Sequence, residues 1–444
     1  MTNTTGPGAL TTGNGILVVD AINGGTTVPG TFALGRPAVA GPYEYSLYRS
    51  SVDASGPENW YLRSELSPVP PGPGPTPSPP GTGIPDFRRE TSLYAALPAM
   101  GLIYGRTLID SLHERVGELA PLTLPPVSEE RTIWCKNPEK NFRCTTTVQL
   151  PASATAPGRS YASAGWARII GQHGNQDGGP WGIYRNGPNY DYYIYAFQAG
   201  LDLYRSISAD GSRDHAGLYA AIGRIQGDVT HFNGARAGTN TIDGYSLGAY
   251  WTHFGPSGWY LDGVLQGTWF DAEADSKRLI KLKRDGFGFA ASLEGGYPLQ
   301  LGNGFILEPQ AQVIYQTLVN GSGGDGAALV RFSDVDSLAA RVGARLARSW
   351  ALEEDTRARP RLLTAWLKAS LWNEFLGNPK TEFSSATGLI PFRADLGASW
   401  AELRTGLDAQ ITRNTALYAS AGYSIGLNGR SHAYDGRLGI KVSW

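Results

Sequence analysis

Residues 287–316 read FGFAASLEGGYPLQLGNGFILEPQAQVIYQ, and apolar side chains fall on alternate positions of two successive segments. Small or polar residues, such as Ser292, Glu294 and Gln312, occupy the positions between them. Successive side chains of a β-strand point to opposite faces, so this period of two predicts strands with one apolar and one polar face. The apolar positions are Phe287, Phe289, Ala291, Leu293, Tyr297 and Leu299 in the first segment and Phe305, Leu307, Ala311, Val313 and Tyr315 in the second.

The same alternation recurs along residues 163–444, where we identify twelve segments. Soluble β-sandwiches typically have a turn about every 8 to 12 residues. Here one strand and its turn together occupy roughly twice that length. Long strands in an even number, with aromatic residues near their ends such as Trp259 and Trp269, predict an outer-membrane β-barrel. The segments begin near Ser163, Asp191, Ala216, Ile242, Gly258, Lys283, Gly304, Ser337, Arg361, Asp395, Ala416 and Ser431.

The apolar faces of these segments suit lipid better than a packed core, because the opposite faces carry Gln, Ser, Gly and only sparse charge. The polar faces are therefore expected to line a lumen. Charged residues on them have both signs and can offset one another or a threaded polypeptide, although each can instead belong to an ordinary solvated sheet face. These lumen candidates are Glu294, Glu308, Arg341, Arg345, Arg404 and Asp408.

The composition excludes two classes of protein. Lys+Arg 38 against Asp+Glu 39 gives a net charge of -1, which provides no global positive field for binding nucleic acid. The longest apolar stretch, residues 93–105, contains Pro98 and is too short for a transmembrane helix. Charged residues make up 17% of the chain, against about 25% in soluble domains.

Residues 1–15 show no signal peptide. We therefore expect either a cytoplasmic protein or a truncated start, and we favour the truncated start.

Upstream of the alternating segments the chain changes character several times. Short strand-like pieces separated by Gly and Pro turns fill residues 1–66, and residues 67–86 form a Pro/Gly-rich linker. Residues 87–120 are predicted to be a helix, with Pro98 interrupting or kinking it. Residues 121–160 are a polar insertion, and residues 161–444 carry the barrel. One side of the helix would present Glu90, Tyr94, Leu97, Met100 and Tyr104, and its charged second half contains Arg106, Asp110, His113, Glu114 and Arg115.

Two further features stand out within these regions. Cys135 and Cys144 lie close together in an otherwise cysteine-free chain, which favours a local disulfide over two free thiols. The final strand has apolar residues on one face and ends in an aromatic, as expected if assembly machinery reads an exposed strand edge. The residues of this predicted assembly signal are Tyr434, Leu438, Ile440, Val442 and Trp444.

Several stretches resemble the translocator domain of autotransporters, the type V secretion family. They are residues 92–118 (SLYAALPAMGLIYGRTLIDSLHERVGE), residues 243–272 (DGYSLGAYWTHFGPSGWYLDGVLQGTWFDA), residues 304–316 and the terminal GIKVSW. AGPYEYSLYR at 40–49 and NWYLRS at 59–64 are similar to the end of a pertactin-like β-helical passenger that assists passenger folding. Two departures are the short passenger portion and the cysteine-containing insertion.

The resemblance implies an all-β protein: a monomeric twelve-stranded antiparallel barrel in the bacterial outer membrane, with a helix in its pore and a β-helix remnant before it. It further implies export and surface display of the chain's own passenger, partnership with lipid and with the barrel-assembly machinery, and no cofactor. What the passenger does at the cell surface is not implied.

Two other functions remain as alternatives. An adhesin could bind host ligands through a surface loop such as residues 172–189. An outer-membrane hydrolase could use one of two GxSxG motifs, at Ser246 or Ser424, but that motif requires a strand-turn-helix elbow and both copies lie inside alternating strands. The histidines are dispersed without ligand spacing, so no metal site is expected. We therefore predict that the chain is not an enzyme.

Overall fold

A computed structural model places twelve long antiparallel strands in a closed ring. It describes residues 7–66, 83–116, 128–137, 140–149, 164–352, 361–396, 399–412 and 414–444, with only the backbone of the strands within 128–149. Ring closure comes from pairing of the last strand with the first, and the predicted barrel is confirmed. The strands are β7 (Ala164–Gln176), β8 (Asn189–Ile207), β9 (Arg213–Thr230), β10 (Arg236–Phe254), β11 (Tyr260–Asp275), β12 (Leu282–Gly296), β14 (Phe305–Asn320), β17 (Val335–Ala351), β18 (Leu362–Glu374), β21 (Ser399–Gln410), β22 (Thr415–Gly426) and β23 (Ser431–Ser443).

The two faces of each strand separate as the alternation predicts. Leu293 is 49% exposed and points outward, whereas the next residue, Glu294, is 4% exposed and points into the barrel. Phe287, Phe289 and Val313 are also exposed on the outside. The outer wall therefore carries a continuous apolar band, which is what a barrel surrounded by hydrocarbon requires.

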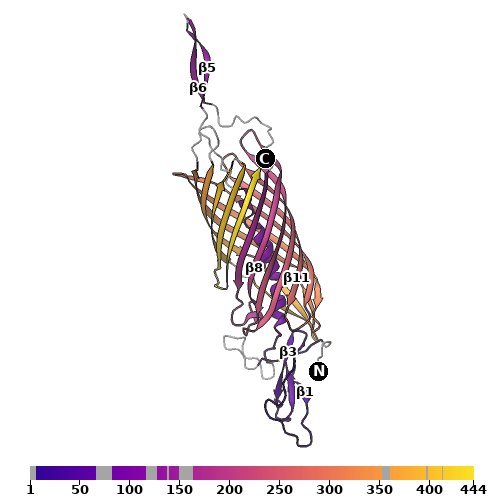
Figure 1. Ribbon diagram of the computed structural model, residues 1–444. Coiled ribbons are helices and arrows are strands. Elements are labelled where there is room, and N and C mark those ends of the chain that lie inside the picture. The colour runs from indigo at the N-terminus through magenta and orange to yellow at the C-terminus, as the bar shows by residue number, and fades with distance from the viewer. Residues whose placement is uncertain are drawn as a thin grey trace.

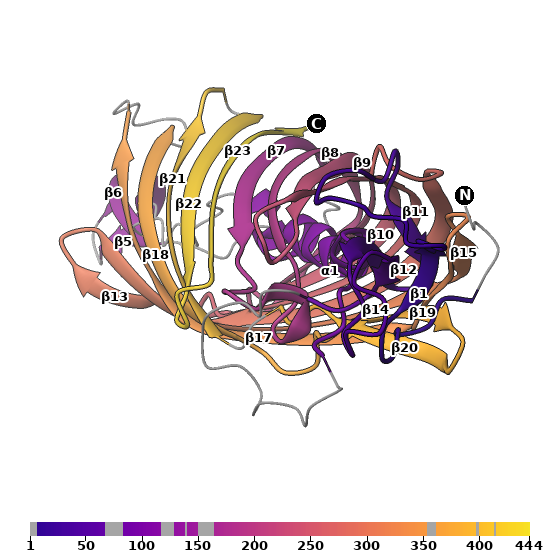
Figure 2. The same cartoon turned by 90° about the horizontal axis from the view of Figure 1, so that it is seen from below.

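A single helix, α1 (Glu90–Ile109), runs inside the ring and is followed by a short 3-10 turn, η1 (Leu112–Val116) (Figures 1 and 2). Every α1 residue except Arg106 is buried, as expected for a helix enclosed on all sides. The predicted interruption at Pro98 is wrong, because the helix continues through this residue. Proline lacks the backbone N–H that would bond the Tyr94 carbonyl four residues earlier, yet the helix continues because Pro98 is buried within the enclosing wall. Nearby, the Asn240 side chain of β10 donates to the Leu93 carbonyl at 2.7 Å. No helix among the described residues is long and apolar enough to cross a membrane.

The residues before α1 form a small sheet at the end of the barrel where the helix begins (Figure 1). Tyr43, Tyr45, Trp60 and Tyr61 are buried within this N-terminal segment, residues 7–66. Its strands follow the order β1-β4-β3-β2: β1 (Ile16–Val19), β2 (Ala38–Ala40), β3 (Tyr43–Arg49) and β4 (Trp60–Arg63).

Loops at the same end of the barrel carry a second small sheet, which we call the mouth sheet. It consists of β15 (Ser322–Gly324), β16 (Leu329–Phe332), β19 (Lys380–Ser385) and β20 (Gly388–Arg393), in that order. A short turn, η2 (Gly182–Tyr184), lies in the loop between β7 and β8. The N-terminal segment, η2 and the mouth sheet thus all meet the start of α1.

Two smaller elements complete the chain at the other end of the barrel (Figure 1). β13 (Leu299–Gly302) pairs only with β14, and β5 (Ser128–Asn137) pairs with β6 (Lys140–Gln149) in a separate hairpin. The predicted Cys135–Cys144 disulfide concerns side chains that lie outside the described residues, so it stays a prediction.

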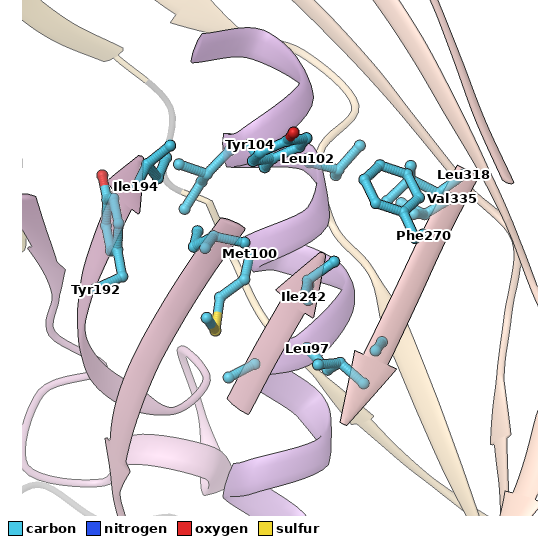
Figure 3. Packing of buried hydrophobic residues seen from close by; sticks show 14 of the residues in the cluster. Leu97, Met100, Leu102, Tyr104, Tyr192, Ile194, Ile242, Phe270, Leu318 and Val335 are labelled. Atoms are coloured by element: carbon cyan, nitrogen blue, oxygen red, sulfur yellow. The ribbon is translucent and has the colours of Figure 1, made fainter. Parts of the chain in front are cut away.

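Glycines on the inner wall make room for the helix. Leu97, Met100, Leu102 and Tyr104 project from α1 toward the strands (Figure 3). A Cβ atom on Gly244 of β10 would lie 2.5 Å from Cε1 of Tyr104, and one on Gly227 of β9 would lie 2.8 Å from Cε of Met100. The wall is therefore shaped around this particular helix.

Replacing Gly244 with alanine should loosen the helix, because the added methyl group overlaps the Tyr104 ring. Overpacking of this kind costs about 1–3 kcal/mol. We expect the folded band on unboiled gels to unfold at a lower temperature in Gly244→Ala. Gly436→Ala is the matched control, since a Cβ there meets nothing within 4 Å. Equal melting of both variants would contradict the fit.

Candidate functional site in the barrel lumen

The charged residues predicted for the second half of the helix all contact the barrel wall. Asp110 accepts a hydrogen bond from Arg437 of β23 at 2.9 Å, and Glu114 lies 3.4 Å from Lys368 of β18. Arg404 of β21 approaches Glu114 at 4.0 Å. The acidic residues of this terminal turn therefore face a cationic part of the wall, formed by β18, β21 and β23.

The basic residues of the same turn face the opposite sign. Arg115 lies 3.0 Å from Asp262 of β11, and His113 Nδ1 lies 2.7 Å from the same carboxylate. Asp262 is 1% exposed. His113 also stacks on Tyr260, with ring centroids 3.8 Å apart. The acidic and basic side chains of the turn thus meet opposite charges on different strands, which restricts how the turn can rotate inside the lumen.

Arginines also bind the carbonyl groups that the end of a helix leaves without partners. Arg168 of β7 donates to the Leu108 and Ser111 carbonyls, each at 2.9 Å. Arg115 donates to the Leu112 carbonyl at 2.8 Å. These contacts satisfy orphan acceptors and place positive charge at the negative end of the helix dipole. The side chain of Arg437 additionally contacts Ser111.

Three of the six predicted lumen residues belong to buried ion pairs. Arg341 lies 2.8 Å from Glu294, which also accepts a hydrogen bond from Tyr260. Arg404 lies 2.6 Å from Asp435 of β23. All three are nearly inaccessible, with exposures of 2 to 4%. They join the helix end and the strands into one charged network.

The other three predicted lumen residues line a cavity beside the helix end, and Glu294 lines it too. The cavity has a volume of about 120 Å³, and Glu308, Arg345 and Asp408 contribute to its wall together with His113 and Glu114. Arg345 lies over Trp366, whose Nε1 donates to Asp408 at 2.8 Å. Of the helix residues, Arg106 stands apart: it lies 4.5 Å from the Trp400 ring centre and 3.9 Å from Glu374.

Several wall residues of this network were not singled out from the sequence. They are Arg168, Asp262, Lys368, Asp435 and Arg437. Each occupies the polar face of a strand in the alternating pattern, so a search for buried charge on those faces could have found them. What the pattern cannot show is which wall residue reaches the helix.

The predicted assembly signal lies on the outer surface of the last strand. Tyr434, Leu438, Ile440, Val442 and Trp444 are all exposed there, with Trp444 at 59%. Arg437 on the same strand points inward, toward Asp110. The face is therefore apolar and open to contact, and its role in assembly stays a prediction.

The two GxSxG motifs serve packing inside strands. Gly244 makes room for Tyr104, and a Cβ on Gly248 would collide with Tyr219. Between these glycines, Ser246 contacts the Thr268 hydroxyl at 2.9 Å. Ser424 lies within β22, opposite Glu402 and Ala433. In the part of the chain that the structure describes, no group of three His, Cys, Asp or Glu side chains is arranged to hold a metal ion.

Two family models match this chain. The autotransporter β-domain matches residues 165–422, and the autochaperone domain type 1 matches residues 1–47. The crystal structure of the transport unit of the autotransporter AIDA-I from Escherichia coli has the same fold, with a TM-score of 0.54 and 21% identity over 66% of this chain and 92% of that one.

Curated relatives extend the similarity beyond the barrel. The adhesin BmaC autotransporter of Brucella suis is 27% identical over 100% of this chain, and the autotransporter adhesin AIDA-I of Escherichia coli is 25% identical over 93%. The pertactin autotransporter of Bordetella bronchiseptica is 28% identical over 64%. The chain spans 12%, 28% and 29% of these three proteins.

Replacing Arg437 with glutamine should free the end of the helix, because Asp110 would lose its cation inside the lumen. Removing one partner of a buried ion pair destabilises by about 3–5 kcal/mol. We expect more frequent opening of single channels in planar bilayers. Arg236→Gln is the control, since the Arg236–Asp228 pair is 66% and 55% exposed. An opening frequency equal to that of the control would contradict the proposal that Arg437 fixes the end of the helix.

Proposed function

This chain belongs to the autotransporter family. We propose which step of export each of its parts performs. Its barrel lies in the bacterial outer membrane, and its function is to export and display its own passenger at the cell surface. The N-terminal segment and the start of α1 lie at one mouth of the barrel. That mouth therefore faces the cell surface, and the end with η1 and the β5–β6 hairpin faces the periplasm.

In this proposal α1 is the trailing part of the exported chain, which stays in the barrel as a plug when export ends. The observation that carries it is the enclosure of the helix: every residue but Arg106 is buried, and both charge and shape of the wall match it. Residues 7–66 are the last part of the passenger and residues 67–86 its link to the helix. Similarity of residues 1–47 to an autochaperone domain supports a role of this segment in passenger folding.

We also propose the partners of the outer wall. The exposed apolar band contacts outer-membrane lipid, and the barrel-assembly machinery reads the last strand through the residues listed above as the assembly signal. We propose that the barrel acts as a monomer; its ring closes within one chain, so no second chain is needed to complete it. Residues of the GxSxG motifs pack within the wall, which supports a protein without enzymatic activity.

Two of the relatives are adhesins by name, but the surface loop at 172–189 is a poor candidate for adhesion here. Its Tyr184 stacks on Phe87 at 5.1 Å and donates a hydrogen bond to the Pro85 carbonyl. Trp181 is 5% exposed. The loop is therefore occupied by the protein's own chain, and an adhesive activity would reside in the passenger.

Deleting residues 90–116 tests the plug directly. Without the helix the lumen should conduct freely, so we expect a larger single-channel conductance than that of the intact chain in planar bilayers. A heat-dependent gel shift of the deletion variant serves as the control that its barrel is still closed. Equal conductance of two closed barrels would contradict the plug.

Replacing Trp444 with aspartate tests the assembly signal. The charge removes an apolar contact from the edge that strand addition would use, so the variant should reach the outer membrane more slowly in a pulse-chase experiment. Trp350→Asp is a control, since Trp350 is also exposed, at 41%, but lies on β17. Equal delays for both variants would show a general effect of outward charge rather than a terminal signal.

A further inference from the structure

Charge is absent from the middle of α1 and concentrated at its two ends. Residues 91–105 contain no charged side chain, whereas Arg88, Arg89 and Glu90 precede them and Arg106 follows. The charged contacts that oppose sliding along the lumen therefore gather near the ends, where Tyr94, about one turn into the helix, also donates to the Asp325 carboxylate at 3.0 Å. The depth of the helix must then depend on what holds the ends.

Arg88 is completely buried at the surface end and contacts three parts of the protein at once. Its Nη1 lies 2.6 Å from Asp325, in the loop between β15 and β16. Its Nε donates to the Gly41 carbonyl of the N-terminal segment at 2.7 Å. Its guanidinium lies 5.2 Å from the ring centre of Phe383 in the mouth sheet. Arg88 thus joins the exported segment to two barrel loops.

Further charges extend this contact into an alternating row. Glu90 lies 3.6 Å from Arg88 and 3.6 Å from Arg278, which belongs to the loop between β11 and β12. Arg278 in turn lies 2.9 Å from Glu44 of β3. The row Asp325–Arg88–Glu90–Arg278–Glu44 therefore runs from the mouth sheet through the start of the helix to the N-terminal segment.

The partner of Arg88 is itself held in place. Asp325 accepts hydrogen bonds from the backbone amides of Ala327 and Ala328, each at 3.0 Å, and from the Tyr94 hydroxyl at 3.0 Å. It is 1% exposed. The carboxylate is thus a fixed and desolvated acceptor, which makes its contact with Arg88 depend strongly on position.

Backbone contacts fix the N-terminal segment on the same loops. The Gly41 amide donates to the Ala327 carbonyl at 2.9 Å, and the Ala386 amide of the β19–β20 turn donates to the Gly8 carbonyl at 2.7 Å. Phe87, directly before Arg88, packs against Tyr43 and Phe392. These contacts and those of Arg88 require one and the same position of the chain in the mouth.

We propose that Arg88 is the positioning residue that sets the depth at which the exported chain comes to rest. One helical turn of movement toward the periplasm, about 5.4 Å, would pull its guanidinium away from Asp325 and further into the enclosed lumen. A buried charge without its partner is strongly unfavourable. The charges of η1 oppose movement toward the surface in the same way. This inference rests on the proposed function, in which α1 is the end of the exported chain.

The test measures helix depth with a single cysteine at Leu112, which is fully buried beside the periplasmic half of the lumen. Cys135 and Cys144 are replaced by serine, and the intact chain is treated with a membrane-impermeant maleimide in outer-membrane preparations open to the periplasmic side. Movement toward the periplasm would bring Leu112→Cys out of the lumen. We expect Arg88→Gln and Asp325→Asn each to raise its labelling rate at least tenfold.

Two comparisons separate positioning from general stability. Combining Arg88→Gln with Asp325→Asn should raise labelling little beyond either change alone, because both remove one contact. Arg88→Lys, which keeps the charge, should restore most of the protection. Arg331→Gln is the matched control: this arginine lies in the same loop region but is 63% exposed. The heat-dependent gel shift should be unchanged throughout.

Protection of Leu112→Cys in every variant would overturn the role of Arg88. Should Arg88→Gln fail to form a closed barrel, Asp325→Asn alone decides, since asparagine keeps the shape and can still accept the loop amides. Full labelling of the parent chain, with the barrel closed, would contradict the resting plug itself. The two failures are therefore distinguishable.

Discussion

The whole structure depends on the requirement that every backbone amide and carbonyl in hydrocarbon finds a partner within the protein. A sheet meets it only by closing on itself, and here β23 pairs with β7 over its full length to complete the ring. In a closed ring each strand has one face toward lipid and one toward the interior. Apolar side chains therefore alternate with polar ones along the strand, the apolar ones pointing to the lipid. The interior becomes a lumen lined by charges and glycines, and the chain's own helix fills it.

Filling the lumen with a helix raises the question of what fixes it there. The answer differs along its length. Shape acts in the middle, where Gly227 and Gly244 receive Met100 and Tyr104. Charge acts at both ends. At the periplasmic end, basic residues of η1 contact Asp262, and the acidic residues Asp110 and Glu114 contact lysine and arginine side chains of the wall. At the surface end, Arg88 contacts Asp325. A neutral middle between charged ends allows passage of a chain and still defines where passage stops.

The sequence predicts the barrel well, because a period of two repeated over long segments leaves few other structures. It likewise places Glu294, Arg341 and Arg404 in the lumen from their position on polar faces. It could not show that the helix would continue through Pro98, since the wall that buries this residue is built from strands distant in the sequence. Nor could it show the mouth sheet or the burial of Arg88, because both arise where three loops and the N-terminal segment meet in space. Glu308, Arg345 and Asp408 illustrate the same limit: the pattern gives their face but not their partners.

Amide hydrogen exchange of the intact barrel in lipid nanodiscs, followed by mass spectrometry, tests the central claim most directly. The claim is that residues 90–109 rest as a fully enclosed helix inside a closed ring. We predict that peptides from this region exchange as slowly as those from the barrel strands, over hours rather than seconds. Exchange of the helix within seconds, while the strands stay protected, would mean that the lumen is not filled by α1 and would contradict the account.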